Sequence, residues 1–179
     1  MENAALTLRH ADAADATALA ALHHSVWGET YGALAPAEAV ARLDLRHRLR
    51  GWQAMLDDPD RKAWLVEGGT GGALGLVAIG PPAAPEFAAL PGPVGEIRHL
   101  YVAETARRLG LGRRLLGTAL EALAAQGCAT GALGVVRQNY AARLFYAEQG
   151  GREGAVYLDP GPLWRSLMVL VSWDLRSPR

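Results

Sequence analysis

The chain has 179 residues, of which 50% are hydrophobic, enough for one well-packed domain and short for two. Its 18 basic and 18 acidic side chains give a formal net charge of +0. This argues against a general binder of nucleic acid or anionic membranes, which needs a basic excess. The one cysteine, Cys128, excludes an internal disulfide. Without a signal peptide or an apolar run of about 18 residues, we expect a cytoplasmic protein with a single domain over residues 1–179.

The first third of the chain predicts a strand and a helix. The alternating run at residues 6–9 predicts the strand, and Asp12 and Asp15 are suitable caps for an alanine-rich helix that follows it. We expect Gly28 and Gly32 to bracket a break in this helix. The broken segment holds Trp27, Glu29 and Tyr31.

Residues 36–79 predict a second helix and a hairpin. The helix is expected to follow Pro36 and to run through Leu56. Its arginines are interpreted as a solvated face; they are Arg42, Arg46, Arg48 and Arg50. Strands at 63–67 and 74–79 flank the glycine-rich residues 68–72, and glycine supplies the positive φ that a hairpin turn needs.

The second half of the chain predicts alternating strands and helices. In order, they are a long loop over 80–95, a strand over 96–102, a helix over 111–126 with Gly127 as its C-cap, a strand over 133–136, a helix over 139–148, and a hairpin of strands over 155–158 and 167–175. The whole order indicates a mixed α/β fold with a β-α-β unit. The final strand is apolar enough to pair with a second copy in a homodimer.

One short segment, Arg107-Arg108-Leu109-Gly110-Leu111-Gly112, lies at the junction of a predicted strand and helix. Two glycines one residue apart allow backbone N–H groups to approach a bound group closely. Free N–H groups at a helix start bind anions, and the arginines add positive charge. We interpret this segment as a pyrophosphate-binding turn.

Other glycine-rich junctions fit the segment less well. A P-loop needs Lys and then Ser or Thr after its last glycine, and Arg113 and Arg114 follow Gly112 here. A dinucleotide fingerprint needs a third glycine where the chain has Leu115, and an acidic residue about 20 positions further on. A purely structural turn with exposed arginines stays open at this point.

Three segments together resemble the GNAT superfamily of acyl-CoA-dependent N-acetyltransferases. They are Glu96–Val102, Arg107-x-x-Gly110-x-Gly112 and Asn139-x-x-Ala142-x-x-Phe145-Tyr146-x-x-x-Gly150. The resemblance implies a mixed, mostly antiparallel sheet flanked by helices, with a central parallel β-α-β unit. It also implies transfer of an acetyl group from acetyl-CoA to a primary amine of a small molecule or peptide. We expect direct attack in a ternary complex, because the sequence offers no credible covalent nucleophile. Two positions depart from the family pattern: Ala103 stands where proline is common, and Gly151 where an aromatic residue is common.

The resemblance implies acetyl-CoA as the co-substrate, with the turn on its pyrophosphate and the preceding strand on its pantetheine arm. The residues that would bind it are Leu100, Tyr101, Val102, Arg107, Arg108, Leu109, Gly110, Leu111, Gly112, Arg113 and Asn139. Asn139 also suits an N-cap, and both roles can hold at once.

The chemistry asks for a proton acceptor and a proton donor, because an amine with a pKa near 10.4 is mostly protonated at neutral pH. The resemblance implies Tyr146 as the acid that meets the coenzyme sulfur; the alternative is an ordinary core aromatic. Glu96 matches the glutamate base of histone-acetyltransferase relatives; the alternative is a salt bridge to Arg98.

In relatives, the segment holding Trp27, Glu29 and Tyr31 lines the acceptor pocket, where aromatic rings attract a cationic amine. Trp27 could equally be ordinary core. His23 and His24 face different directions, so we expect no metal site. A non-catalytic acyl-CoA-binding or sensor protein on the same fold is the alternative function, and a nicotinamide-binding domain is disfavoured by the missing glycine and acidic residue.

Overall fold

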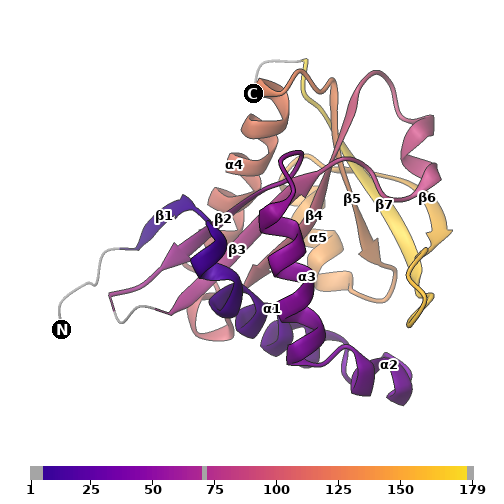
Figure 1. The fold of residues 1–179 in the computed structure, drawn as a ribbon. Helices are drawn as coiled ribbons and strands as arrows, with labels where there is room; N and C mark the ends of the chain where they lie inside the picture. Colours follow the sequence, from indigo (N-terminus) through magenta and orange to yellow (C-terminus); the bar gives the residue numbers. More distant parts are fainter. Residues whose placement is uncertain (1–5, 70–71, 177–179) are drawn as a thin grey trace. The chain divides into compact units, whose positions relative to one another are not determined.

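The computed structural model describes residues 6–69 and 72–176 (Figure 1). Thr70 and Gly71, in the predicted glycine turn, lie outside the described residues. The chain divides into two compact units. The first unit comprises residues 1–78 and 99–116, and the second comprises residues 79–98 and 117–179. The single domain expected over residues 1–179 stays a prediction.

Seven strands form a sheet in the order β1-β2-β3-β4-β5-β7-β6. They are β1 (Thr7–His10), β2 (Lys62–Glu67), β3 (Ala73–Gly80), β4 (Val94–Val102), β5 (Thr130–Val136), β6 (Arg152–Leu158) and β7 (Leu167–Asp174). β1 runs antiparallel to β2, as β7 does to both β5 and β6, whereas β4 and β5 run parallel. The predicted mixed, mostly antiparallel sheet with one parallel pair is confirmed. β7 lies between β5 and β6, so the idea that it pairs with a second copy is wrong.

The helices differ from the prediction in the first third of the chain. They are α1 (Ala16–Tyr31), α2 (Ala37–Arg42), α3 (Leu45–Asp57), α4 (Leu111–Ala125) and α5 (Tyr140–Glu148). None of those lying in residues 6–69 and 72–176 has the length and apolar composition needed to cross a bilayer.

The single helix predicted from Pro36 to Leu56 is wrong, because the chain forms two helices there. The Asp44 side chain accepts a hydrogen bond from the His47 N–H at 2.7 Å and so caps a new helix. Aspartate is among the preferred N-cap residues, and its short side chain competes with helix continuation. The loop predicted at 80–95 contains a short 3₁₀ helix, Pro85–Ala89, whose Phe87 is fully buried, and ends where β4 begins.

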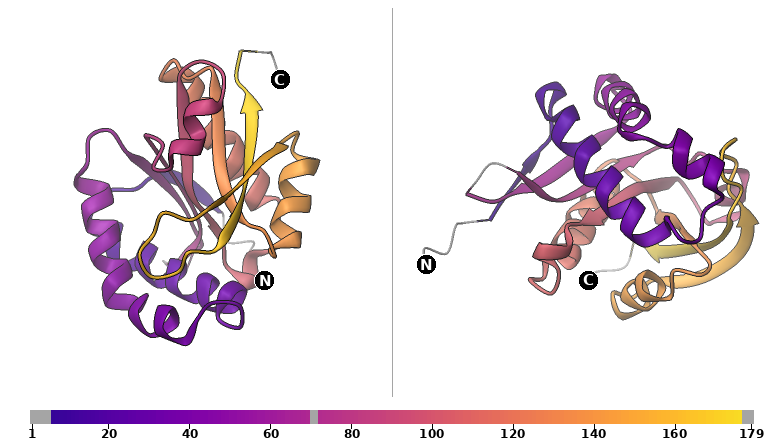
Figure 2. Two further views of the ribbon diagram at one scale, coloured as in Figure 1. Left: turned by 90° about the vertical axis from the view of Figure 1, so that its right-hand side faces the viewer. Right: turned by 90° about the horizontal axis from the view of Figure 1, so that it is seen from below.

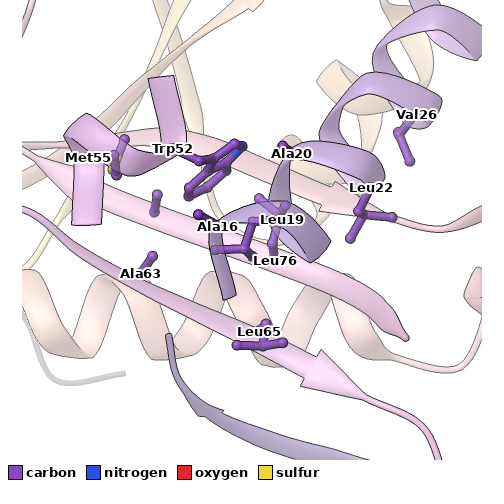
Figure 3. Packing of buried hydrophobic residues seen from close by; sticks show 11 residues of the cluster. Ala16, Leu19, Ala20, Leu22, Val26, Trp52, Met55, Ala63, Leu65 and Leu76 are labelled. Carbon is purple, nitrogen blue, oxygen red and sulfur yellow. The ribbon is translucent and has the colours of Figure 1, made fainter. Parts of the chain in front are cut away.

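The core of the first unit lies where α1 and α3 pack side by side against β2 and β3 (Figures 1 and 2). Figure 3 shows Trp52 reaching from α3 towards Leu19 and Ala20 of α1, beside the strands that carry Leu65 and Leu76. The aliphatic and indole side chains are removed from water almost completely, which is the main favourable term in folding.

In the second unit, two glycines that face each other on the parallel strands β4 and β5 allow α4 to pack closely on these strands. Gly95 of β4 and Gly131 of β5 are register partners. A Cβ on Gly95 would lie 2.2 Å from the Leu123 side chain, and one on Gly131 would lie 2.8 Å from the Leu120 side chain. Glycine at both positions therefore allows the leucine face of α4 to approach the strands closely.

An ion network joins β1 to the start of α1. Arg9 donates to both carboxylate oxygens of Asp15 at 2.7 Å and also to Glu67 on β2. Asp15 accepts the Asp12 N–H at 2.8 Å and Asp12 accepts the Ala14 N–H at 2.9 Å, which forms a capping box. The hydrogen bonds from Arg9 lower the pKa of Asp15.

We predict that Leu19→Ala destabilises the protein by about 2–5 kcal/mol, because it leaves a cavity in the core of the first unit. Leu45→Ala, at an exposed leucine of α3, is the matched control and should cost less than about 1 kcal/mol. Urea unfolding of both variants measures the difference, and equal losses would contradict the packing described above.

A second prediction concerns pH. Since the pKa of Asp15 is lowered in the folded state, its contribution is present above the unfolded pKa, near 3.9, and is lost as pH falls through the folded value. Asp15→Asn should therefore be less stable than the wild type near neutral pH, with a gap that shrinks in acid. Urea midpoints measured across that range provide the test, and a gap independent of pH would contradict it.

Candidate active site

The predicted pyrophosphate turn opens directly into α4. Arg108 is the one non-glycine residue in residues 6–69 and 72–176 with a positive φ, at 66°, and Gly110 follows at 76°. The Gly110 carbonyl accepts the Arg114 N–H at 3.1 Å, which begins the helical hydrogen bonding of α4. The N–H groups of Leu111 to Arg113 precede any intrahelical acceptor, so this turn can bind an oxyanion.

The space beside Gly110 is open. Apart from its neighbours in the chain, no heavy atom of the described residues lies within 4 Å of the position that a Cβ on Gly110 would occupy. Gly110 is thus needed for its left-handed backbone and not for side-chain packing. The adjacent Leu109 is 61% exposed.

Two residues that are predicted to bind different ligands, the coenzyme and the acceptor, contact each other. Arg107, expected on the coenzyme, donates to Glu29, expected on the acceptor, with 3.1 Å between Nη2 and Oε2. The second Glu29 oxygen accepts from the Ser25 hydroxyl at 2.8 Å. Sequence spacing alone contains no signal for this pair, because 78 residues separate its members.

The segment holding Trp27, Glu29 and Tyr31 is not a break between helices, as predicted, but the last turns of α1. Gly28 is accommodated inside the helix because hydrogen bonds and packing of the surrounding turns outweigh its low propensity. Trp27 is buried, as the core alternative expected, and its ring centroid lies 5.9 Å from that of Tyr31.

The end of β4 faces a group of aromatic and histidine rings in the first unit. The Tyr101 ring stacks on His23 with 4.6 Å between centroids, and His99 lies 4.7 Å from His23. Trp52 donates its indole N–H to His23 Nδ1 at 3.3 Å. Burial, reinforced by the charges of neighbouring basic groups, lowers the pKa of His23, so this histidine is neutral and structural.

Glu96 is held in the second unit by two donors. One oxygen accepts the Ala83 N–H at 2.7 Å and an Arg98 N–H at 3.3 Å. The salt bridge to Arg98 expected as the alternative is therefore present, and the role as base stays a prediction. The charge of Glu96 also affects Tyr157, a residue that the sequence analysis did not single out. Burial, and then the charge of Glu96, raises the pKa of Tyr157.

Tyr146 and Asn139 lie on and before α5 in the second unit. Asn139 caps α5 by accepting the Ala142 N–H at 3.1 Å, which confirms its structural role. Tyr146 is buried, and its ring meets Trp173 of β7 edge-on at 5.9 Å. Trp173 in turn donates to the Gln149 carbonyl at 3.0 Å and holds the end of α5 on β7. The Tyr146 ring is thereby kept in one orientation.

Arg48 does not belong to a solvated helix face, so the prediction is wrong for this residue. Its side chain is half-buried, and its guanidinium carbon lies 5.0 Å from the Trp27 ring centroid. Arg42, Arg46 and Arg50 are exposed as predicted. Helical spacing could have predicted the burial of Arg48, because position 48 is one turn before the core residue Trp52.

No group of three metal-ligating side chains is found in residues 6–69 and 72–176. Of the predicted site residues, the first unit holds the turn, Leu100 to Val102 and the end of α1. The second unit holds Glu96, Asn139 and Tyr146.

Comparisons with known proteins identify the fold and the family. A PaiA N-acetyltransferase from Thermoplasma acidophilum in complex with coenzyme A is 17% identical, with a TM-score of 0.68 over 93% of this chain and 98% of that one. A ribosomal-protein-alanine N-acetyltransferase from Brucella melitensis is 24% identical, with a TM-score of 0.69 over 94% of this chain and 99% of that one. Arabidopsis thaliana NAA60, in complex with a bisubstrate analogue, is 15% identical, with a TM-score of 0.73 over 95% of this chain and 99% of that one.

These likenesses show a common fold. No curated protein matches the sequence. The model of the acetyltransferase (GNAT) family matches residues 19–151, which is most of the chain and includes the turn, β4 and α5. The protein belongs to the GNAT family of acetyltransferases.

Proposed function

We propose that this protein transfers an acetyl group from acetyl-CoA to a primary amine of a small molecule or peptide. The observation that carries the proposal is the turn before α4, in a chain that belongs to an acetyltransferase family. The left-handed backbone at Arg108 and Gly110 directly precedes a helix N-terminus, where free N–H groups and the helix dipole attract an anion.

The coenzyme supplies an activated acetyl group as a thioester. Backbone N–H groups of residues 110–113 would bind its pyrophosphate, and Arg107 and Arg108 would add positive charge. Leu100, Tyr101 and Val102 at the end of β4 would offer main-chain groups to the pantetheine arm. Asn139 would contact the same arm while it caps α5.

Tyr146 is the proposed general acid. Its phenol would give a proton to the sulfur as the carbon–sulfur bond breaks and the carbon–nitrogen bond forms. The support is its place in the family motif and its fixed ring, packed on Trp173. Fixed geometry matters because proton transfer needs heavy atoms within hydrogen-bond reach.

Glu96, directly or through a water molecule, is the proposed acceptor of the amine proton. Its Oε2 already accepts from Ala83 and Arg98, which hold the carboxylate in place. Trp27, Glu29 and Tyr31 are proposed to contact the acceptor. The Brucella melitensis structure, named as a ribosomal-protein-alanine N-acetyltransferase, supports an amine acceptor.

Transfer is proposed to be direct. Cys128 is the chain's one cysteine, and burial raises the pKa of its thiol, which keeps it protonated and poorly nucleophilic. A covalent acetyl-cysteine route therefore has no suitable nucleophile.

We expect Gly110→Ala to weaken acetyl-CoA binding about tenfold or more, because an alanine at φ 76° shifts the turn. Gly127→Ala, at φ 84° after α4, is the matched control, since both positions have open space beside them. Both variants should lose about 1–2 kcal/mol of stability through backbone strain. Calorimetric titration with acetyl-CoA measures affinity, and absence of binding to the folded wild type would refute the proposal.

Tyr146→Phe is expected to lower kcat about 10²-fold or more while leaving the KM for acetyl-CoA nearly unchanged. Tyr140→Phe, at the exposed tyrosine that begins α5, serves as control and should keep full activity. The assay follows release of the coenzyme A thiol with a panel of amines. Acetyl-CoA binding without turnover of any amine would favour the non-catalytic binding protein.

A further inference from the structure

Arg48 is held in an aromatic setting within the first unit. It lies in the first half of α3, and its guanidinium carbon is 5.0 Å from the Trp27 ring centroid. A guanidinium over an indole face is attracted by the ring quadrupole, so this contact fixes the plane of the group. Trp27 is itself buried on α1, one turn before Tyr31.

Two donors of this guanidinium have no acceptor. Arg48 Nε and Nη2 are both shielded from solvent, and neither makes a hydrogen bond to any residue in 6–69 or 72–176. Buried donors are nearly always paired in folded proteins, since an unpaired one forfeits its bonds to water. Nε and Nη2 are also the two donors of one edge, the edge that binds a carboxylate with two parallel hydrogen bonds.

The charges around Arg48 do not offset its own. No ion pair to a carboxylate is found for it within the described part of the chain. Burial lowers the pKa of Arg48, and the nearby Tyr101 phenol partly offsets this effect. Burial, and then the positive charge of Arg48, lowers the pKa of His47. The positive charge of Arg48 is therefore not balanced by an ion pair in the described part of the chain, and an anion would neutralise it.

We propose that Arg48 binds a carboxylate carried by the acceptor, so that the substrate class is an amino acid or another amine with a nearby carboxyl group. The carboxylate would accept from Nε and Nη2 side-on while Trp27 keeps the guanidinium plane in place. The side chain as a whole is half-buried, and a small carboxylate that reaches Nε and Nη2 would replace the protein atoms that cover these two donors. This assignment rests on the proposed N-acetyltransferase function.

The activity test compares L-amino acids with their C-terminal amides as acceptors. The wild type should prefer the acid at least tenfold in kcat/KM. Arg48→Met should abolish that preference by lowering activity on acids alone, with an unchanged KM for acetyl-CoA. Arg48→Lys keeps the charge without the two-donor edge and should fall between the two. Arg50→Met, at an exposed arginine of the same helix, should behave as wild type.

The thermal stability of Arg48→Met distinguishes a binding role of Arg48 from a structural one. Arg48→Met removes two unpaired buried donors and keeps an apolar stem against Trp27, so its thermal midpoint should be equal to that of the wild type or higher. A lower midpoint, together with equal losses on acids and amides, would overturn the proposal in favour of a structural role.

A binding measurement makes the outcome independent of turnover. In ¹⁵N NMR spectra, the Arg48 Nε–H signal, identified by its absence in Arg48→Met, should move on titration with acetate and stay in place with acetamide. No difference between the two probes would overturn the carboxylate site, whatever the activity. A specific shift without acetylation of any amine would support the site and refute the proposed transfer.

Discussion

The seating of α4 on the parallel strands is the constraint on which the rest of the protein depends. Gly95 and Gly131 face each other across β4 and β5, and the missing side chains leave room for Leu123 and Leu120. A Cβ at either glycine would overlap one of these leucine side chains, so a larger residue there forces the packing to shift. Since α4 begins at the turn, this packing holds in place the helix whose free N–H groups are proposed to bind the pyrophosphate.

Several residues of the proposed site combine a structural contact with a chemical group. Asn139 caps α5, Tyr146 packs on Trp173, and Glu96 is held by Ala83. Such contacts restrict side-chain rotation before any ligand arrives, which lowers the entropy lost on binding. Arg48 differs from them, because its stacking on one face leaves the hydrogen bonds of one edge unmade.

The sequence correctly predicted those elements of the fold that depend on residues close together in the chain. The turn before α4 follows from glycine and helix-start chemistry, and the antiparallel β6–β7 hairpin from turn residues between apolar runs. The parts it predicted badly involve competition between local rules. Gly28 was expected to end α1 and does not, whereas Asp44 begins a new helix inside a segment predicted as continuous. Propensity differences of about 1 kcal/mol cannot decide such cases against packing.

The sequence by itself determined the family, the order of the strands and the position of the glycine turn before α4, because each is encoded by spacing within a short window. Only the tertiary structure decided which residues meet across long separations. It joined Glu29 to Arg107, placed β7 inside the sheet, and brought Arg48 onto Trp27. These contacts depend on how helices and strands pack in three dimensions, and burial and charge pairing follow from that packing and not from neighbours in the chain.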